Sequence, residues 1–449
     1  MAESQIRVLS FNCWGLKYVS KHRSQRIEGI ANELANSSYD IIALQEIWVY
    51  ADYENVQQRI SKQLPYSKFF YSGALGAGLA IFSRFPIVAT TVHPYSLNGT
   101  PIDVAAGDWF VGKAAASVVV YHPVLGHIQI FNTHLFAKGG EDGPEHNRAH
   151  RLVNAWEFAK LARHAAELGR YVIALGDFNS IPTTLPMTVI REHAALSDSW
   201  LVTHPNESSI PSVSSPLEAI TRFGVTADSP LNSYSAGKPL DPHARKFWGK
   251  RLDYVLYRQP YRPHISSKSE VPVLRAIDCK VVLTDNVPGF DYSLSDHFGL
   301  EATLEIQETP HEELFSERRT PPSDQPITLA RAPSELSNAS IATVIQAMTT
   351  CYQFSRQRAK KEIRIFGLCL FLLVAIIFGT SWLPYSWINP IFLILAIFIS
   401  WLATTMLYEG FLYGNWECNA LMNIIEELEI YRKGLQIQSG VRGDLLTTD

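Results

Sequence analysis

The chain has 449 residues, enough for two or three domains at about 150 residues each. Its net charge of -4, from 39 Lys and Arg against 43 Asp and Glu, argues against a surface that coats polyanions such as nucleic acid. Charged residues make up only 18% of the chain, below the ~25% typical of soluble domains, so an apolar segment must dilute the composition.

Residues 1–306 combine short apolar runs, typical of strands, with stretches of helical periodicity. The expected strands are Ile6–Asn12, Ile41–Glu46, Leu79–Ser83, Ala116–Tyr121, Ile128–His134, Tyr171–Asp177, Leu252–Tyr257 and Phe298–Ile306. The expected helices include Ser24–Asn36 and His146–Leu168. Many neighbouring strands have no helix between them, so this α/β pattern predicts two packed sheets with helices outside rather than one parallel sheet.

Residues 307–362 lead from this domain to the C-terminal part of the chain. Residues 307–334 are rich in Pro, Ser and charge, which is typical of a linker. Residues 335–362 carry an apolar stripe at helical spacing and run directly into an uncharged segment. We expect an amphipathic helix here that docks on the N-terminal domain or lies on a lipid surface.

Residues 363–413 contain two uncharged stretches, 365–383 and 391–408, each close to the ~20 residues that cross a bilayer as a helix. The turn between them is bracketed by Pro384 and Pro390, which cannot continue a helix interior. The alternative is a pair of core helices in a soluble domain. Two such runs in tandem predict a transmembrane hairpin instead, preceded by a juxtamembrane helix.

Flanking charge predicts the orientation of this hairpin. The basic residues that precede the first span are Arg356, Arg358, Lys360, Lys361 and Arg364. Because the turn carries no charge, the positive-inside tendency places the N-terminal domain in the cytosol and returns residues 414–449 there as a tail. The scattered cysteines, which form no Cys-x-x-Cys pair, and the absence of a signal-like N-terminus fit this reducing compartment. The short spans favour the endoplasmic reticulum over the mitochondrial or plasma membrane.

Several strand-like runs end in a polar side chain at the point where the apolar run finishes. These side chains are Asn12, Glu46, His134, Asp177 with Asn179, Asp253, and Asp296 with His297. One of them alone is usually a turn or helix cap. Because strand ends on one edge of a sandwich converge in space, the whole set predicts a single polar cleft.

The order of the motifs QE, NTHL, GDFN, RLDY and SDHFG across about residues 6–306 resembles the endonuclease/exonuclease/phosphatase superfamily. Within it, FNCWGLKY, GAGLAIFSRFPI, DSPLNSY, GKRLDYVLYR and the hairpin resemble the membrane-anchored neutral sphingomyelinases, above all their fungal branch, the inositol phosphosphingolipid phospholipases C. The resemblance implies a four-layer α/β/β/α sandwich, as in deoxyribonuclease I, as the catalytic domain. It also implies Mg²⁺-dependent hydrolysis of a membrane phosphosphingolipid to ceramide and a phosphorylated headgroup.

The resemblance further implies a metal site and a general base. Glu46 would be the main Mg²⁺ ligand, and Asn12 and Asp296 would help to hold the ion and its waters. Oxygen ligands of this kind suit Mg²⁺, which keeps several waters. His297 would take a proton from the attacking water, and Asp253 would orient and charge-stabilise its ring.

Three further residues would act on the water and the phosphate. Asp177 would position the nucleophilic water, while Asn179 and His134 would donate hydrogen bonds to phosphoryl oxygens. Phosphoryl transfer depends on placement and charge neutralisation more than on covalent chemistry, which this set of residues supplies.

Residues 107–113, GDWFVGK, satisfy the phosphate-binding pattern G-x-x-x-x-G-K. Ala114 follows where a P-loop needs Ser or Thr, and the chain continues as a strand, which argues against an NTPase. The resembling phospholipases carry an Asp and a Lys five residues apart here as a conformational switch, and Asp108 and Lys113 match that spacing. The alternative is a surface salt pair on a β-hairpin.

Three other functions stay open. A nuclease of the same fold would share the catalytic residues, but we see no basic stripe for a phosphate backbone and expect no nucleic-acid partner. An inositol-polyphosphate phosphatase would carry a Trp-Cys-Asp-Arg block where this chain has KRLD at residues 250–253. An inactive lipid sensor would not need every catalytic-type position to be occupied.

Two expectations concern the lipids. The basic residues before the first span predict activation by anionic phospholipids, phosphatidylserine or cardiolipin. The substrate headgroup stays open between inositol phosphate and phosphocholine, because these need different pocket charges and the sequence does not identify the pocket wall.

Overall fold

The computed structural model describes residues 4–104, 107–139, 143–205, 213–261, 270–310, 335–382 and 385–446. The chain divides into two units. The first comprises residues 1–95, 111–141 and 154–337, and the second comprises residues 96–110, 142–153 and 338–449. This division does not follow a single boundary near residue 306, because two internal segments group with the C-terminal helices. Most of the expected linker, residues 311–334, lies outside the described residues.

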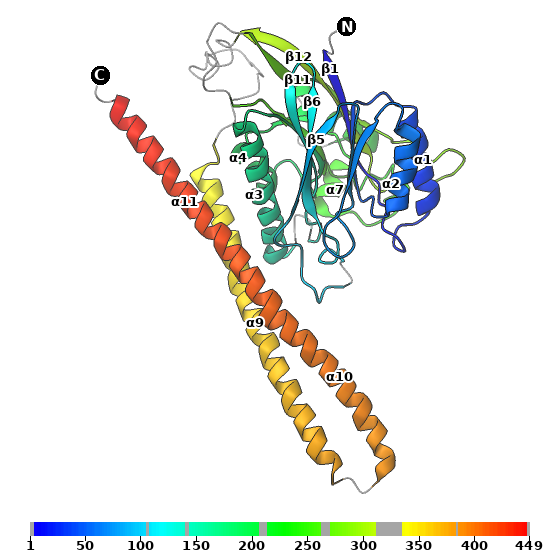
Figure 1. Ribbon diagram of the computed structural model, residues 1–449, viewed down its shortest axis with the longest axis vertical. Coiled ribbons are helices and arrows are strands. Elements are labelled where there is room, and N and C mark those ends of the chain that lie inside the picture. Colours follow the sequence, from blue (N-terminus) through cyan, green and yellow to red (C-terminus); the bar gives the residue numbers. More distant parts are fainter. Residues whose placement is uncertain are drawn as a thin grey trace. The chain divides into compact units, whose positions relative to one another are not determined.

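Two six-stranded sheets form the first unit (Figure 1). The strands of one sheet, in spatial order, are β11 (Glu270–Val282), β12 (Gly299–Pro310), β1 (Gln5–Asn12), β2 (Ile41–Gln45), β4 (Leu79–Ser83) and β3 (Tyr66–Phe70). Those of the other are β5 (Ile87–Pro94), β6 (Ala114–His122), β7 (Gly126–His134), β8 (Tyr171–Asp177), β10 (Asp253–Arg258) and β9 (Ser197–Asp198). The central pairs β1 with β2 and β7 with β8 are parallel, and their neighbours are antiparallel.

Alternation along the strands separates the layers. In β1, Ile6 and Val8 belong to the core between the two sheets, whereas Leu9 and Phe11 belong to a second core on the opposite face. Helices α1 (Arg23–Ala35) and α2 (Tyr50–Ile60) contribute to that second core. On the far face of the other sheet, Phe158 of the next long helix packs against Phe131. Successive side chains of a strand point to opposite faces, so each sheet presents one face to its partner and one to helices. The α/β/β/α sandwich is confirmed.

The remaining helices are short except for one. They are α3 (Glu145–Glu167), α4 (Leu185–His193), α5 (Ser199–Thr203), α6 (Pro216–Phe223) and α7 (Pro242–Phe247). Helix α3 begins and ends one residue earlier than the expected helix His146–Leu168. The other four were not expected from periodicity, since each is too short to show a clear apolar stripe.

The eight expected strands are the interior strands of the two sheets, and the four that were not expected are the edges, β11, β3, β5 and β9. The residues of β5 are mostly exposed, in contrast to the fully buried β8. Strand β11 carries charged residues and a register shift between Ala276 and Asp278. Edge strands bury less surface and carry charges, bulges and Pro to prevent aggregation, so they lack the apolar run that marks a strand in the sequence.

Asn132 in β7 links the two sheets through a buried polar network. Its Nδ2 donates to the carbonyl oxygens of Leu44 (2.8 Å) and Ala80 (2.9 Å) in the facing sheet. Its Oδ1 accepts a hydrogen bond from Nε2 of Gln45 at 2.8 Å. Asn132 is fully buried. The network fixes the second sheet against the end of β2, next to the polar strand ends.

We expect Asn132→Leu to destabilise the protein by about 2–5 kcal/mol, because it removes the side-chain hydrogen bonds to two buried carbonyls and the acceptor of one from Gln45. Thermal unfolding of the full chain in detergent measures this as a lower Tm. The matched control is Asn32→Leu, at an exposed position of α1, which should leave the Tm nearly unchanged. Equal Tm values for the two variants would contradict a supporting role for the network.

The C-terminal helices of the second unit form an antiparallel hairpin (Figure 1). Helix α9 (Asn338–Thr380) packs along α10 (Asn389–Leu407) and α11 (Gly414–Leu446), and a π-helical turn at Tyr408–Tyr413 joins the last two. Within the described residues, two helical stretches, Asn338–Thr380 and Ser386–Ile437, are long and apolar enough to cross a membrane. Only 6% and 11% of their most apolar windows are buried in the protein, so these side chains are free to face lipid.

The α9 and α11 helices approach each other closely where the π-helical turn ends. A Cβ at Gly414 would lie 2.6 Å from the Cβ of Ala359, and a Cβ at Gly410 would lie 2.9 Å from the Ala359 carbonyl oxygen. Beyond this contact, the apolar stripes of both helices are buried. In the apolar stripe that was expected over residues 335–362, Ile341, Val344 and Met348 are fully buried. The predicted tail therefore includes a helix that folds back along the juxtamembrane helix.

Glu417 of α11 is the centre of a buried polar cluster in the second unit. It accepts hydrogen bonds from Nε2 of His150 (2.8 Å) and from Arg358 (2.6 Å). Nδ1 of His150 accepts from the backbone N–H of Gly99 at 2.9 Å, so Nε2 carries the proton. Cys351 lies close enough to His150 and Glu417 for the three side chains to be considered as metal ligands. Because both ring nitrogens are engaged, this cluster is a closed hydrogen-bonded set rather than an open metal site.

Candidate active site

The sheet topology brings the predicted polar residues of the first unit to one edge of the sandwich. Asn12 ends β1, and Glu46 follows β2, its parallel neighbour. His134 ends β7 and pairs in register with Asp177, which ends the parallel strand β8. Asp253 begins the antiparallel β10 directly opposite Asp177. The carboxyl ends of parallel strands share an edge, so the convergence follows from the two parallel pairs.

Asn12 is hydrogen-bonded to carboxylates on both sheets. Its Nδ2 donates to Oε1 of Glu46 (3.1 Å) and to Oδ2 of Asp177 (3.0 Å). Its Oδ1 accepts from the backbone N–H of Trp14 at 2.9 Å, which fixes the orientation of the amide. In this arrangement Asn12 positions the two carboxylates with its nitrogen. The expected role of Asn12 in holding an ion and its waters stays a prediction.

His297 and Asp253 form the pair expected of an oriented base. Nδ1 of His297 lies 2.9 Å from Oδ2 of Asp253, and Nε2 lies 3.8 Å from Oδ2 of Asp177. Burial opposes charging of the ring, but Asp253 and Asp177 outweigh it and raise the pKa of His297 well above its usual value. Since Asp253 engages Nδ1, the atom left for proton transfer is Nε2.

Glu46 and Asp296 form a carboxylate pair suited to a divalent cation. Burial, reinforced by the charge of Asp296, raises the pKa of Glu46 to about 7. Burial also raises the pKa of Asp296, although His297 acts in the opposite direction. Glu46 and Asp296 are partly buried, and two neighbouring carboxylates that each favour a proton carry more negative charge than their surroundings balance. A hard cation would balance that charge. The residues present therefore fit Mg²⁺.

Lys113 and His134 are in direct contact. Nζ of Lys113 donates to Nε2 of His134 (3.2 Å) and to the carbonyl oxygen of Leu135 (2.9 Å). Burial and the Lys113 ammonium lower the pKa of His134 well below its usual value, so the ring is neutral. His134 also lies 3.5 Å from Asp177. In this arrangement Nε2 of His134 accepts a hydrogen bond from Lys113, and the expected hydrogen bond from His134 to a phosphoryl oxygen stays a prediction.

Asn179 and Asp108 complete the set of expected site residues. The backbone N–H of Asn179 donates to Asp177 (2.9 Å), and its side-chain amide donates to the Leu135 carbonyl (3.0 Å). Asp108 is buried and belongs to the second unit, whereas Lys113 belongs to the first. The switch formed by Asp108 and Lys113 stays a prediction.

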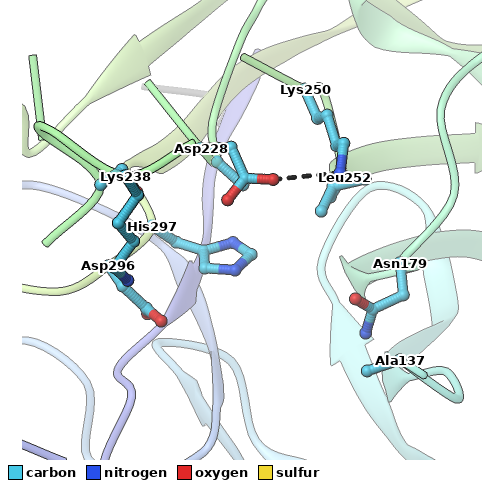
Figure 2. A pocket seen from close by; sticks show the side chains of 10 residues that line it. Ala137, Asn179, Asp228, Lys238, Lys250, Leu252, Asp296 and His297 are labelled. Atoms are coloured by element: carbon cyan, nitrogen blue, oxygen red, sulfur yellow. Dashed lines mark ion pairs between the residues drawn. The ribbon is translucent and has the colours of Figure 1, made fainter. Parts of the chain in front are cut away.

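A cavity of about 300 Å³ opens beside His297 (Figure 2). It is lined by Ala137, Asn179, Ala227, Asp228, Ser235, Lys238, Lys250, Leu252, Asp296 and His297. Three of these were expected, Asn179, Asp296 and His297. No role in the site was predicted for the charged side chains Asp228, Lys238 and Lys250, although Asp228 and Lys250 belong to the motifs DSPLNSY and GKRLDYVLYR.

Three residues of this region have left-handed backbone conformations that non-glycine residues rarely adopt. The φ angles are 53° at Glu46, 46° at Asn179 and 56° at Asp228. Such conformations cost free energy and are retained where the surrounding structure enforces them, commonly at functional sites. Asp228 joins the site because it lines the same cavity as His297.

Arg26 of α1 supports the loops that carry the site. It is fully buried and donates to the carbonyl oxygens of Cys13 (2.8 Å), Trp14 (2.6 Å) and Leu294 (3.1 Å). These carbonyls belong to the segments that follow β1 and precede β12. A buried arginine on an amphipathic helix gives no sequence signal of this role.

Comparisons with known proteins agree with this geometry. The model of the endonuclease/exonuclease/phosphatase family matches residues 9–297. The chain is 35% identical to an inositol phosphosphingolipids phospholipase C of Schizosaccharomyces pombe, over 95% of this chain and 94% of the relative. It is 31% identical to the protein of that name from Saccharomyces cerevisiae, over 94% and 89%. Sphingomyelin phosphodiesterase 2 of Homo sapiens is 32% identical over 72% of this chain and 70% of its own.

Both the motif order and the two-sheet fold had indicated this resemblance. The match to the family model covers the strands that carry Asn12, Glu46, His134, Asp177 and Asp253. The chain therefore belongs to the endonuclease/exonuclease/phosphatase family and, among the enzymes of that family, to the group of the inositol phosphosphingolipid phospholipases C and sphingomyelin phosphodiesterases.

Proposed function

We propose that this protein is a Mg²⁺-dependent phosphodiesterase of the phospholipase C type that hydrolyses phosphosphingolipids of the membrane that it spans. The observation that carries the proposal is that His297, 2.9 Å from Asp253, lies on the wall of a cavity that Asp296 also lines. A positioned base beside clustered carboxylates is the arrangement that metal-assisted hydrolysis of a phosphodiester requires.

The residues divide the reaction between them. In its neutral form, the ring of His297 takes a proton from water on Nε2 as the water oxygen attacks phosphorus, and Asp253 holds the ring and stabilises its charge. The bond between phosphorus and the ceramide oxygen breaks, that oxygen takes up a proton from solvent, and His297 then releases its proton, which gives ceramide and a phosphorylated headgroup. Asp177, 3.8 Å from Nε2, positions the water. Together, the two products contain all the atoms of the lipid and of the water.

Glu46 and Asp296 would hold the Mg²⁺, with Asn12 keeping Glu46 in place. When bound, the ion would neutralise developing charge on the phosphate and on the leaving oxygen. The lysine Lys113 brings a second positive charge to the same edge through its contact with His134.

Turnover assays on purified full-length protein test the proposal. The substrates are inositol phosphosphingolipid, sphingomyelin and abasic DNA, each with Mg²⁺ and with EDTA. We expect Mg²⁺-dependent release of ceramide from phosphosphingolipid and no cleavage of DNA. Cleavage of DNA alone would indicate a nuclease of the same fold, and no turnover of any substrate would indicate a lipid sensor.

The C-terminal hairpin would tether the catalytic domain to the membrane that contains its substrate. A substrate confined to the bilayer is met by an anchored site at high effective concentration. We propose that the catalytic domain and the tail face the cytosol, and that the endoplasmic reticulum is the main location. The support is the basic flank of the first span and the shortness of both spans.

Anionic phospholipids, phosphatidylserine or cardiolipin, are the proposed activators. Lys360 and Lys361 are exposed next to the first span, whereas Arg358 is engaged by Glu417. The cations available to lipid are therefore the two lysines with Arg356 and Arg364, each contributing roughly 1 kcal/mol near an anionic surface.

We expect the double variant Lys360→Glu, Lys361→Glu to lose most of its activation by anionic lipid, because roughly 2 kcal/mol of attraction is removed and repulsion is added. The measurement is turnover in neutral micelles and in micelles that contain phosphatidylserine. The matched control reverses the charges of Arg432 and Lys433 in the middle of α11. Full activation of the lysine variant would count against electrostatic recruitment by this segment.

A further inference from the structure

The cavity beside His297 is too small for a whole lipid but large enough for a headgroup. Its volume of about 300 Å³ is at the lower limit of ligand pockets. Because His297 and Asp296 are on its wall, a phosphate at the reaction centre would place its polar substituent in this cavity. The side chains of the cavity therefore select the headgroup.

An ion pair between Lys250 and Asp228 forms one side of the cavity. Nζ of Lys250 lies 3.1 Å from Oδ2 of Asp228 and also pairs with Asp241, the N-cap of α7. Burial alone would lower the pKa of Lys250, but the two carboxylates outweigh it and raise it, so the ammonium stays charged. Its side chain is 13% exposed, and that of Asp228 is 47% exposed. The pair is held in place, yet open to a ligand.

The backbone holds this pair next to the base. Ala227 forms antiparallel bridges with both Lys250 and His297, so Asp228 directly follows the residue that joins them. Figure 2 shows Asp228 and Lys250 along one edge of the cavity, with Lys238 on the side of His297 and Asn179 on the opposite side. Asp228 has a left-handed φ of 56°, a conformation that Asp adopts more readily than most other non-glycine residues.

These groups match the hydrogen-bonding needs of a polyhydroxylated ring. Each hydroxyl both donates and accepts, and the cavity offers a carboxylate acceptor in Asp228, ammonium donors in Lys250 and Lys238, and the hydroxyl of Ser235. A quaternary ammonium has no hydrogen-bonding group and binds best over aromatic rings. None of the ten described residues that line the cavity is Phe, Tyr or Trp, so a quaternary ammonium would find no aromatic ring there.

We infer that Lys250, Asp228 and Lys238 form a headgroup subsite that selects a neutral polyol, such as an inositol ring, over a quaternary ammonium such as choline. The inference rests on the proposed function and assigns the specificity of that reaction to residues outside the catalytic set.

The test uses full-length protein in mixed micelles with three phosphosphingolipids, whose headgroups are inositol, choline and a plain ethyl group. The ethyl lipid reports on the catalytic residues alone, because it needs no headgroup contact. Lys250→Met should lower kcat/KM for the inositol lipid by about 10- to 100-fold, mainly through KM, since a charged hydrogen bond is lost. Turnover of the ethyl lipid should change by less than about threefold.

Two further variants keep the test independent of folding. Lys238 is exposed, so Lys238→Met should fold normally and lower kcat/KM for the inositol lipid without affecting the ethyl lipid. The matched control, Lys280→Met, removes a lysine of β11 that is 54% exposed and pairs with Asp278, and it should behave as wild type on all three lipids. Tm values confirm that each variant is folded.

The outcomes separate the subsite from the proposed function. A wild-type preference for the inositol lipid that both Lys250→Met and Lys238→Met reduce would support the subsite. Equal wild-type rates on inositol and choline lipids, or equal losses on all three lipids in the variants, would overturn it while the phosphodiesterase activity stands. Failure of the wild-type protein to cleave any of the three would overturn the proposed function itself.

Discussion

His297→Ala should lower kcat for phosphosphingolipid hydrolysis by about 10²- to 10⁴-fold, the usual contribution of a positioned general base. Among the predicted site residues, His297 lines the cavity and its ring is oriented by the Asp253 carboxylate, 2.9 Å from Nδ1. With the imidazole removed, the attacking water must lose its proton to solvent. The measurement is release of ceramide in micelles at saturating Mg²⁺.

The control for this loss is His164→Ala, at an exposed position of α3, which should keep wild-type turnover. Asp253→Asn should give an intermediate loss with little change in KM, because Asp253 acts through the ring rather than on the substrate. Its Tm should stay near that of wild type. Wild-type hydrolysis by His297→Ala would remove the base from the mechanism.

Glu46→Gln should lower turnover by about 10³-fold at ordinary Mg²⁺ concentrations, because a metal ion supplies several kcal/mol of charge stabilisation and each 1.4 kcal/mol or so is a factor of ten. The amide keeps the shape of the side chain and its contact with Asn12. It removes the negative charge that, together with that of Asp296, would attract the cation. Removal of Mg²⁺ by EDTA should abolish wild-type activity, and added Mg²⁺ should restore it.

Two readouts distinguish a lost metal ligand from a damaged fold. A Mg²⁺ titration should show a requirement at least tenfold higher for Glu46→Gln, and direct Mg²⁺ binding by calorimetry should weaken in parallel. Glu33→Gln, at an exposed position of α1, is the matched control. An unchanged Mg²⁺ requirement with reduced turnover would mean that Glu46 does not hold the ion.

Short continuous apolar runs made the interior strands of the sandwich predictable. Tyr171–Asp177 is the observed β8, and Leu79–Ser83 is the observed β4, each buried along its whole length. Edge strands such as β5 bury too little to leave the same trace. The polar ends of the interior strands were predictable for the same reason, because a charged residue stands out where a buried apolar run stops.

The contacts among those polar residues were not predictable. The sequence gives no sign that Nδ2 of Asn12, rather than its oxygen, faces Glu46 and Asp177. Nor does it show that Lys113 contacts His134. Which atom of a side chain meets which neighbour depends on backbone direction and rotamer, and these are set by packing between strands that are distant in the chain.

The sequence by itself determined the two-sheet fold of the N-terminal domain, the apolar hairpin and the identity of most residues at the catalytic edge. These features follow from local periodicity and from motifs within single strands. Only the tertiary structure decided the wall of the headgroup cavity, because Asp228, Lys238 and Lys250 lie in irregular segments that isolated bridges to Ala227 bring beside His297. Local patterns specify which face of a strand is buried, whereas a binding site is made by side chains whose neighbours are fixed only when the sheets pack.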